Sequence, residues 1–104
     1  MKNLYHVTTE IEAREAKIRG DYAPKAFEAE GFIHCAYTHQ LAGVLDRFFK
    51  GQTNLVMFEI DRSKVPCKVI DENLGGGAEL FPHIYGRLPM RAVKRTIPAS
   101  GTVL

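Results

Sequence analysis

Leu55-Val-Met-Phe-Glu-Ile60 is a nearly continuous apolar run with the length of one β-strand. It predicts a central strand that is buried on both faces, because a strand with one solvated face alternates apolar and polar residues. Two weaker strand candidates follow at 67–70 and 92–97. We therefore expect the β-structure to be organised around residues 55–60.

A strand followed by a helix is expected at the N-terminus. Residues 4–8 have the length and composition of a short strand. Thr9-Glu-Ile-Glu12 then has the spacing of a capping box, in which the threonine hydroxyl accepts a bond from a free N–H group and the glutamate reaches back. A helix from about Glu10 to Arg19 follows, and Gly20 ends it.

A second strand and a second helix are expected next. Gly31-Phe-Ile-His-Cys-Ala36 has strand character, and Thr38 can cap the helix that comes after it. Gly51 ends that helix. Its apolar residues have the spacing of one buried face and are Leu41, Val44, Leu45, Phe48 and Phe49.

These elements predict one α+β domain that spans residues 1–104. Two early helices pack against five or six strands, and the strands crowd the second half, which disfavours a regular βαβ alternation. A chain of 104 residues with 45% hydrophobic and 25% charged residues has the size and composition of one globular domain.

Charge and targeting signals exclude several functional classes. The formal net charge is only +2, and the basic excess of residues 79–104 is too small to indicate a specific nucleic-acid partner. No secretory signal or membrane span is recognisable. Cys35 and Cys67 form no C-x-x-C pattern, so we expect a cytoplasmic protein with two reduced, buried thiols.

The least regular segment, residues 71–86, contains the first candidate site. Gly75, Gly76 and Gly77 allow a sharp turn or a close approach of the backbone to a ligand, without the spacing of a dinucleotide fingerprint or a P-loop. Pro82 lacks a ladder donor, which predicts a sheet edge or a loop wall for the residues that follow the glycines. In the alternative interpretation, the aromatic residues there only fill the core.

Histidines mark the other candidate positions. His6 and His34 each interrupt an apolar strand, and His83 lies beside the glycine-rich segment. Imidazoles suit proton transfer or an oriented hydrogen bond to a ligand, although each can also be structural. His39 is expected to face solvent. The three histidines and Glu79 would suffice in number for zinc, but no pair has the close spacing of a specific metal motif.

Three motifs together resemble a known family. They are Leu4-Tyr-His-Val-Thr8, Gly31-Phe-Ile-His-Cys35 and Gly75-Gly-Gly-Ala-Glu-Leu-Phe-Pro-His-Ile-Tyr-Gly86, and the family is the bacterial domain of unknown function 952. The resemblance spans essentially the whole chain. Two departures are Ala36, where a small hydroxyl residue is common, and Ala78, which lengthens the glycine loop.

The resemblance implies a fold similar to ADP-ribosyltransferases and RNA 2′-phosphotransferases, with a split β-sheet. In those enzymes an early strand holds NAD or an ADP-ribosylated intermediate, which implies ligand-binding roles for His6 and Thr8. The order of the strands matches His34 to a residue near the nicotinamide ribose. A late glutamate stabilises the positive ribosyl centre, and Glu79 is the candidate here. The implied ligand is NAD or an ADP-ribose-like nucleotide.

Cleavage of an N-glycosidic bond requires stabilisation of a ribosyl cation and binding of the diphosphate in a fixed position. Either Glu79 or His83 could be the principal catalytic group. The sequence therefore predicts three catalytic residues, Glu79, His83 and His34, and seven ligand-binding residues, His6, Thr8, Gly75, Gly76, Gly77, Tyr85 and Arg87. The alternatives are a non-catalytic binding module with structural histidines and a metal-dependent hydrolase.

Overall fold

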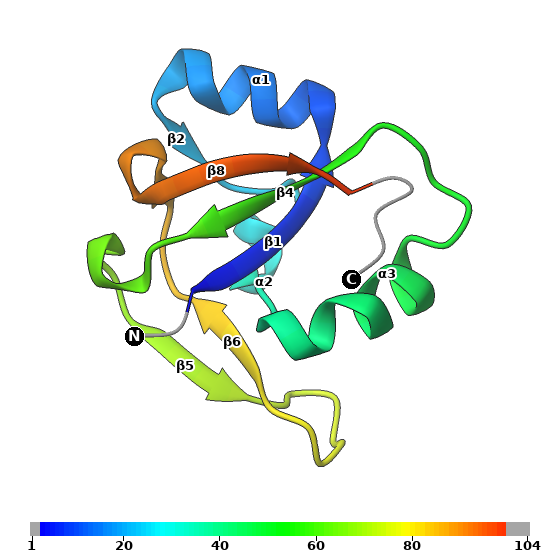
Figure 1. The fold of residues 1–104 in the computed structure, drawn as a ribbon. Coiled ribbons are helices and arrows are strands. Elements are labelled where there is room, and N and C mark those ends of the chain that lie inside the picture. Colours follow the sequence, from blue (N-terminus) through cyan, green and yellow to red (C-terminus); the bar gives the residue numbers. More distant parts are fainter. Residues whose placement is uncertain (1–2, 100–104) are drawn as a thin grey trace.

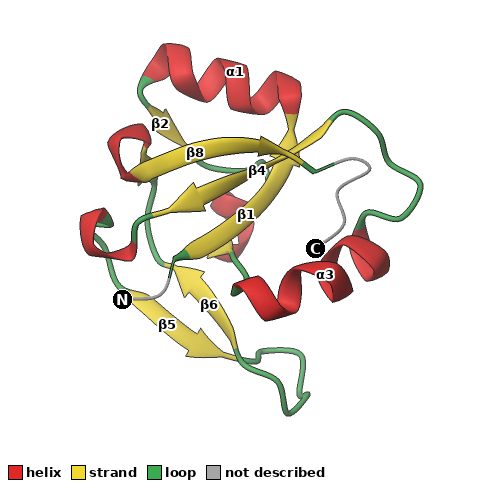
Figure 2. Cartoon of the chain, viewed as in Figure 1, coloured by secondary structure: helices red, strands yellow, loops and turns green. Residues whose placement is uncertain are grey.

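The computed structural model describes residues 3–99 and has an α+β fold, as the sequence predicts (Figure 1, Figure 2). The strands are β1 (Leu4–Thr9), β2 (Asp21–Tyr22), β3 (Ile33–His34), β4 (Leu55–Ile60), β5 (Val69–Glu72), β6 (Phe81–Ile84), β7 (Leu88–Pro89) and β8 (Val93–Pro98). The helices are α1 (Glu10–Arg19), α2 (Phe27–Glu30) and α3 (Leu41–Phe48). Short 3₁₀ turns cover Thr38–Gln40, Arg62–Lys64 and Met90–Ala92.

The strands form three antiparallel sheets with the orders β1-β4-β8, β2-β7 and β3-β6-β5. β4 is the central strand of the first sheet, and all six of its residues are buried, which confirms the prediction made from its apolar run. An isolated bridge between Tyr5 and Ala36 links the outer edge of β1 to the residues that follow β3. Figure 1 shows α3 beyond β1, on the side away from β4.

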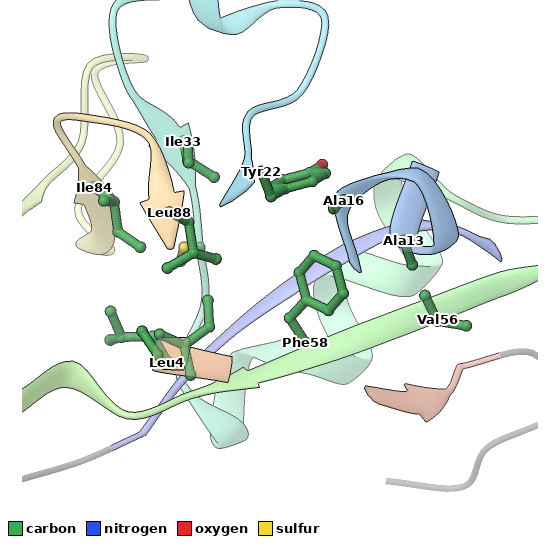
Figure 3. Close-up of a cluster of buried hydrophobic side chains, with 12 residues drawn as sticks. Leu4, Ala13, Ala16, Tyr22, Ile33, Val56, Phe58, Ile84 and Leu88 are labelled. Atoms are coloured by element: carbon green, nitrogen blue, oxygen red, sulfur yellow. The ribbon is translucent and has the colours of Figure 1, made fainter. Parts of the chain in front are cut away.

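The two faces of β4 pack into two hydrophobic clusters. Val56, Phe58 and Ile60 belong to the larger one, together with residues of β1, α1, β2, β3 and β6 (Figure 3). Within it the Tyr22 and Phe58 rings meet edge to face, with centroids 5.1 Å apart. Leu55 and Met57 belong to the smaller cluster, on which α3 packs. The alternation of side chains along a strand thus gives β4 two cores.

α1 has the ends that its sequence predicts. The backbone N–H of Glu12 donates to the Thr9 hydroxyl oxygen (3.1 Å), and this hydroxyl donates to the Glu12 carboxylate (3.2 Å). Gly20 ends the helix in the left-handed region at a φ of 92°, which glycine adopts without steric cost. The Thr9 half of the predicted capping box is therefore present, whereas the Glu12 carboxylate bonds the Thr9 hydroxyl in place of a backbone N–H group.

α3 differs from its prediction at both ends and on its apolar face. Thr38 does not cap it, because the residues before α3 form a 3₁₀ turn whose first N–H group, on Tyr37, donates to the Gln40 side chain. Gly51 lies two residues after the C-cap, Phe49. Only Leu41 of the helical stripe is fully buried. Val44, Leu45 and Phe49 are partly buried against the smaller cluster, whereas Phe48 is exposed and lines a cavity.

The prediction for Pro82 is wrong, because β6 is the middle strand of its sheet. The reason is the direction of the peptide groups. Cys35 N–H donates to the carbonyl of Pro82 (3.0 Å), so the proline nitrogen also faces the end of β3, where the ladder stops after His34. The ladder with β5 uses the peptide groups on the other side and is not interrupted by the proline.

Two further expectations are settled by burial. Cys35 is buried and Cys67 only partly so, and both are free thiols, so the prediction of two buried cysteines holds for Cys35 alone. His39 is exposed, as expected. Between residues 3 and 99 no helix is long and apolar enough to cross a membrane.

Candidate functional site

A cavity of about 540 Å³ runs along the outer edge of β1. His6 and Thr8 line it from one face of the strand, and Tyr5 and Val7 line it from the other, so the cavity follows the strand edge itself. The opposite walls come from the segment between β2 and β3 and from α3. Its volume is within the range of small-molecule sites.

The edge of β1 is paired at one end only. Tyr5 and Ala36 exchange two backbone hydrogen bonds of 2.8 Å each. The chain then turns away toward α3, whereas β1 continues. The N–H and C=O groups of successive residues point to opposite sides of a strand. Those of Val7, two residues after Tyr5, therefore point to the same side as those of Tyr5. Among residues 3–99 neither the N–H nor the C=O of Val7 has a hydrogen-bond partner.

His6 has both ring nitrogens engaged. Nδ1 donates to the carbonyl of His34 (2.5 Å), and Nε2 lies 2.7 Å from the Tyr22 hydroxyl, which is also 3.2 Å from the Thr8 hydroxyl. Burial lowers the pKa of His6 from 6.5 to about 4, so the ring is neutral at pH 7. Nε2 therefore accepts from Tyr22, and the Tyr22 oxygen accepts from Thr8.

This network fixes the elements that carry the cavity. It joins β1 to β2 through Tyr22 and to β3 through the His34 carbonyl. Burial also raises the pKa of Tyr22, which keeps its hydroxyl protonated. The sequence predicts a ligand-binding role for His6, and His6 lines the cavity, but both of its ring nitrogens are bonded within the protein, which makes it a positioning residue.

The polar wall of the cavity also contains a carboxylate–imidazole pair. Nε2 of His34 lies 3.2 Å from both carboxylate oxygens of Glu30, and the His34 side chain is 59% exposed. Glu12 also lines the cavity. Glu30 and Glu12 are the two carboxylates that the described residues bring to the cavity.

His83, in β6, belongs to a separate cluster with Glu72, Tyr85 and Phe32. Its Nδ1 lies 2.9 Å from the Glu72 carboxylate, which also accepts from the Tyr85 hydroxyl. These two bonds lower the pKa of Glu72. Phe32 stacks on the His83 ring with centroids 4.4 Å apart, and the His34 ring lies 5.0 Å from it. His83 is nearly buried and does not line the cavity.

The structure places Glu79 and the three glycines in the turn between β5 and β6. The Asn73 side chain closes this turn, since it donates to the carbonyl of Glu79 (2.7 Å) and accepts from Gly75 N–H (2.8 Å). A Cβ atom at Gly77 would lie 2.8 Å from Asn73, which gives that glycine a structural reason. Neither Glu79 nor Gly75, Gly76 and Gly77 lines the cavity.

Arg87 and Tyr85 also lie outside the cavity. Arg87 makes two bonds to the carboxylate of Asp21, of 2.7 and 3.2 Å, and its guanidinium holds the pKa of that carboxyl below its usual range. This pairing already occupies the fork of Arg87. Of the ten predicted site residues, His6, Thr8 and His34 line the cavity, and His83 contacts His34 through its ring.

Several cavity residues were not predicted. Tyr22 and Glu30 lie in a segment without helical or strand periodicity, and Lys25 has no motif around it. The free peptide edge at Val7 depends on where the chain turns after Ala36, which no local pattern encodes. The described residues contain no group of three or more potential metal ligands, so the metal-dependent hydrolase has no candidate metal site among residues 3–99.

The fold and the cavity define a small α+β domain whose first strand borders a ligand-sized site. The chain belongs to the family described as "Protein of unknown function (DUF952)", whose model matches residues 7–96. This confirms the family resemblance of the three sequence motifs.

Solved structures of CC0527 from Caulobacter crescentus have the same fold. The crystal structure is 28% identical in sequence, with a TM-score of 0.82, and the match covers 92% of this chain and 84% of that one. The solution NMR structure is 29% identical, with a TM-score of 0.81 and coverages of 94% and 84%. A comparison with curated proteins gave no match.

Proposed function

We propose that this protein binds a nicotinamide nucleotide of the NAD type in the cavity beside β1. The observation that carries the proposal is the free peptide edge at Val7, which offers one donor and one acceptor next to each other. A primary carboxamide offers the complementary acceptor and donor, so it can complete both bonds at once. The resemblance to ADP-ribosyltransferases supports the same class of ligand.

The charges around this edge support a cationic ring. Glu12 and Glu30 line the cavity, and the nicotinamide ring of the oxidised nucleotide carries a positive charge. The partly apolar walls favour an uncharged or delocalised ring over a compact, strongly hydrated ion. A carboxamide on a cationic ring therefore fits both the peptide edge and the carboxylates.

Transfer of the ribosyl group is the second candidate function, and the position of Glu30 favours it. The bond between the nicotinamide nitrogen and the ribose would break with its electron pair passing to the ring, and a hydroxyl or water would add to the ribosyl carbon and lose a proton. Glu30 would stabilise the positive ribosyl centre. We therefore assign to Glu30 the role first expected of Glu79, and Glu30→Gln should stop nicotinamide release from NAD while NAD still binds.

Nicotinamide and nicotinate distinguish the peptide-edge contact without any variant. The two rings differ in the side group, since the carboxylate of nicotinate has no N–H donor and repels Glu12 and Glu30. We expect nicotinamide to shift the backbone amide resonance of Val7 in ¹⁵N NMR titrations and nicotinate to leave it in place. Equal shifts with both compounds, or none with nicotinamide and NAD, would refute the proposal.

Val7→Pro tests the same contact by removing the N–H group. The outward direction of this N–H allows a proline there without loss of a ladder bond. We expect about 3- to 10-fold weaker binding of NAD, as for one lost hydrogen bond. Val7→Ile, which keeps the N–H group, is the matched control and should bind normally. Thermal unfolding of both variants verifies that they are folded.

A further inference from the structure

Phe48 is an aromatic side chain at the rim of the cavity that the fold does not use. It lines the cavity and is 61% exposed, although it lies on the apolar stripe of α3. Its position on the stripe predicts burial, and the core packs instead on Leu41 and, in part, on Val44, Leu45 and Phe49. Exposure of a large ring beside a cavity leaves its surface open to a ligand.

One cation without a carboxylate partner lines the cavity, and another is the neighbour of Phe48 in α3. The guanidinium carbon of Arg47 lies 5.8 Å from the centroid of the Phe48 ring. Lys25 lines the cavity from the segment between β2 and α2. Arg19, Arg62, Arg87 and Arg95 each pair with a carboxylate, whereas within residues 3–99 neither Arg47 nor Lys25 has one within 4.0 Å.

We propose that Phe48 and Arg47 bind the purine and phosphate end of the nucleotide, with the purine ring stacked on Phe48. This inference rests on the proposed function and deepens it, because it gives the ligand a direction: carboxamide at β1, purine at α3. Planar bases stack on aromatic side chains, and guanidinium groups pair with phosphate oxygens. Lys25 is the second cation for the diphosphate, as a point charge.

The charges around the cavity suit both parts of such a ligand. Glu12 and Glu30 line the cavity with carboxylates, which favour the cationic ring, and Lys25 lines it with an ammonium group. Arg47 lies beside Phe48 on α3. A ligand with a cationic ring and a diphosphate before its purine is complementary to groups of both signs.

Binding measurements on Phe48→Ala test the stacking contact. We expect NAD and ADP-ribose, measured by calorimetry, to bind about 5- to 100-fold more weakly, while nicotinamide alone binds as to the native protein. Phe48→Tyr, which keeps a ring, should restore most of the affinity. Ile18→Ala is the matched control, because Ile18 is 82% exposed on α1 and does not line the cavity.

Arg47→Gln tests the phosphate contact separately. It should weaken ADP-ribose and NAD, reduce the salt dependence of their affinity, and leave nicotinamide binding unchanged. Arg47→Lys keeps the charge without the planar fork and should recover part of the loss.

The outcomes distinguish the two proposals. Unchanged affinity of Phe48→Ala for NAD and ADP-ribose, with nicotinamide still contacting Val7, would overturn the purine site and leave the proposed function standing. Absence of NAD, ADP-ribose and nicotinamide binding to the native protein would overturn both. Binding of ADP-ribose that depends on Phe48, without any nicotinamide contact at Val7, would support the purine site and overturn the carboxamide assignment.

Discussion

The three histidines near the cavity, His6, His34 and His83, have three different environments, which are set by their hydrogen-bond partners and by their burial. His6 is buried with both nitrogens bonded, His34 is exposed beside Glu30, and His83 is held by Glu72 under the Phe32 ring. The same side chain therefore serves as a structural link, a cavity residue and a member of a polar cluster. Residue type alone does not determine which role each one has.

His6 makes the stability of the protein depend on pH. Its pKa is about 4 in the folded protein and 6.5 as its ordinary value, so protonation favours the unfolded chain. The stabilisation from neutral His6 is fully present above about pH 6.5 and is lost as the pH falls toward 4. The expected loss from this residue between pH 7 and pH 4.5 is about 2 kcal/mol. Urea unfolding at about pH 7 and about pH 4.5 measures it.

His6→Gln and His39→Gln separate this contribution from the other titrating groups. The His6 variant should be less stable at neutral pH and lose less stability on acidification than the native protein. The exposed His39 variant should follow the native pH profile. If His6→Gln keeps the full native pH dependence above pH 4.5, the assignment of that dependence to His6 is incorrect.

At the scale of elements, close packing explains the last glycine of the Phe81–Gly86 motif. A Cβ atom at Gly86 would lie 2.8 Å from the Sγ atom and 2.9 Å from the Cβ atom of Cys67. A methyl group at this position would therefore push the chain after β6 away from the chain before β5, and only glycine allows the two chains to lie this close. The sequence suggested a site-related role for this motif, and the structure gives its glycine a packing role.

Gly86→Ala should therefore destabilise the protein by about 1–3 kcal/mol, as overpacking does. Gly43→Ala is the matched control, because Gly43 lies within α3 and nothing approaches its added methyl group within 4 Å. There the change should stabilise the protein by up to about 1 kcal/mol through helix propensity. Chemical unfolding of the two variants tests both signs, and a destabilised Gly43→Ala would contradict the open space at that position.

Elements with local signals could be predicted from the sequence. The apolar run of β4, the capping threonine of α1 and the terminal Gly20 act over a few residues, and all three are found. β2 and α2 are too short to have a period. The role of Pro82 depends on which neighbour its nitrogen faces, and the exposure of Phe48 depends on a cavity formed by distant segments. These features require the tertiary arrangement.

At the scale of the whole molecule, the cavity is assembled from parts that only the fold brings together. Its walls come from β1, the segment after β2, the residues around His34, and α3. The sequence located three of its residues, His6, Thr8 and His34, because they lie in strands with recognisable motifs. The structure places the remaining predicted residues elsewhere, in the β5–β6 turn, beside Glu72 and in an ion pair with Asp21.

A ligand in this cavity should stabilise the entire domain. It contacts walls that are joined in the folded state only, so binding adds RT ln(1 + [L]/Kd) to the free energy of unfolding, about 2.7 kcal/mol at a hundredfold excess over Kd. NAD should therefore raise the midpoint of thermal unfolding in a concentration-dependent way, and Val7→Pro should reduce the shift. An unchanged midpoint at saturating NAD would contradict binding to the folded state.

The free peptide edge at Val7 has a consequence for self-association. Exposed strand edges are templates for pairing with other chains, and proteins generally shield them with a covering element. Here α3 lies across the cavity from that edge and packs on the same hydrophobic cluster as Val7. Partial unfolding that detaches α3 would open β1 to intermolecular β-pairing, so an empty cavity leaves the protein closer to aggregation, and an occupant that bonds the Val7 peptide groups protects against it.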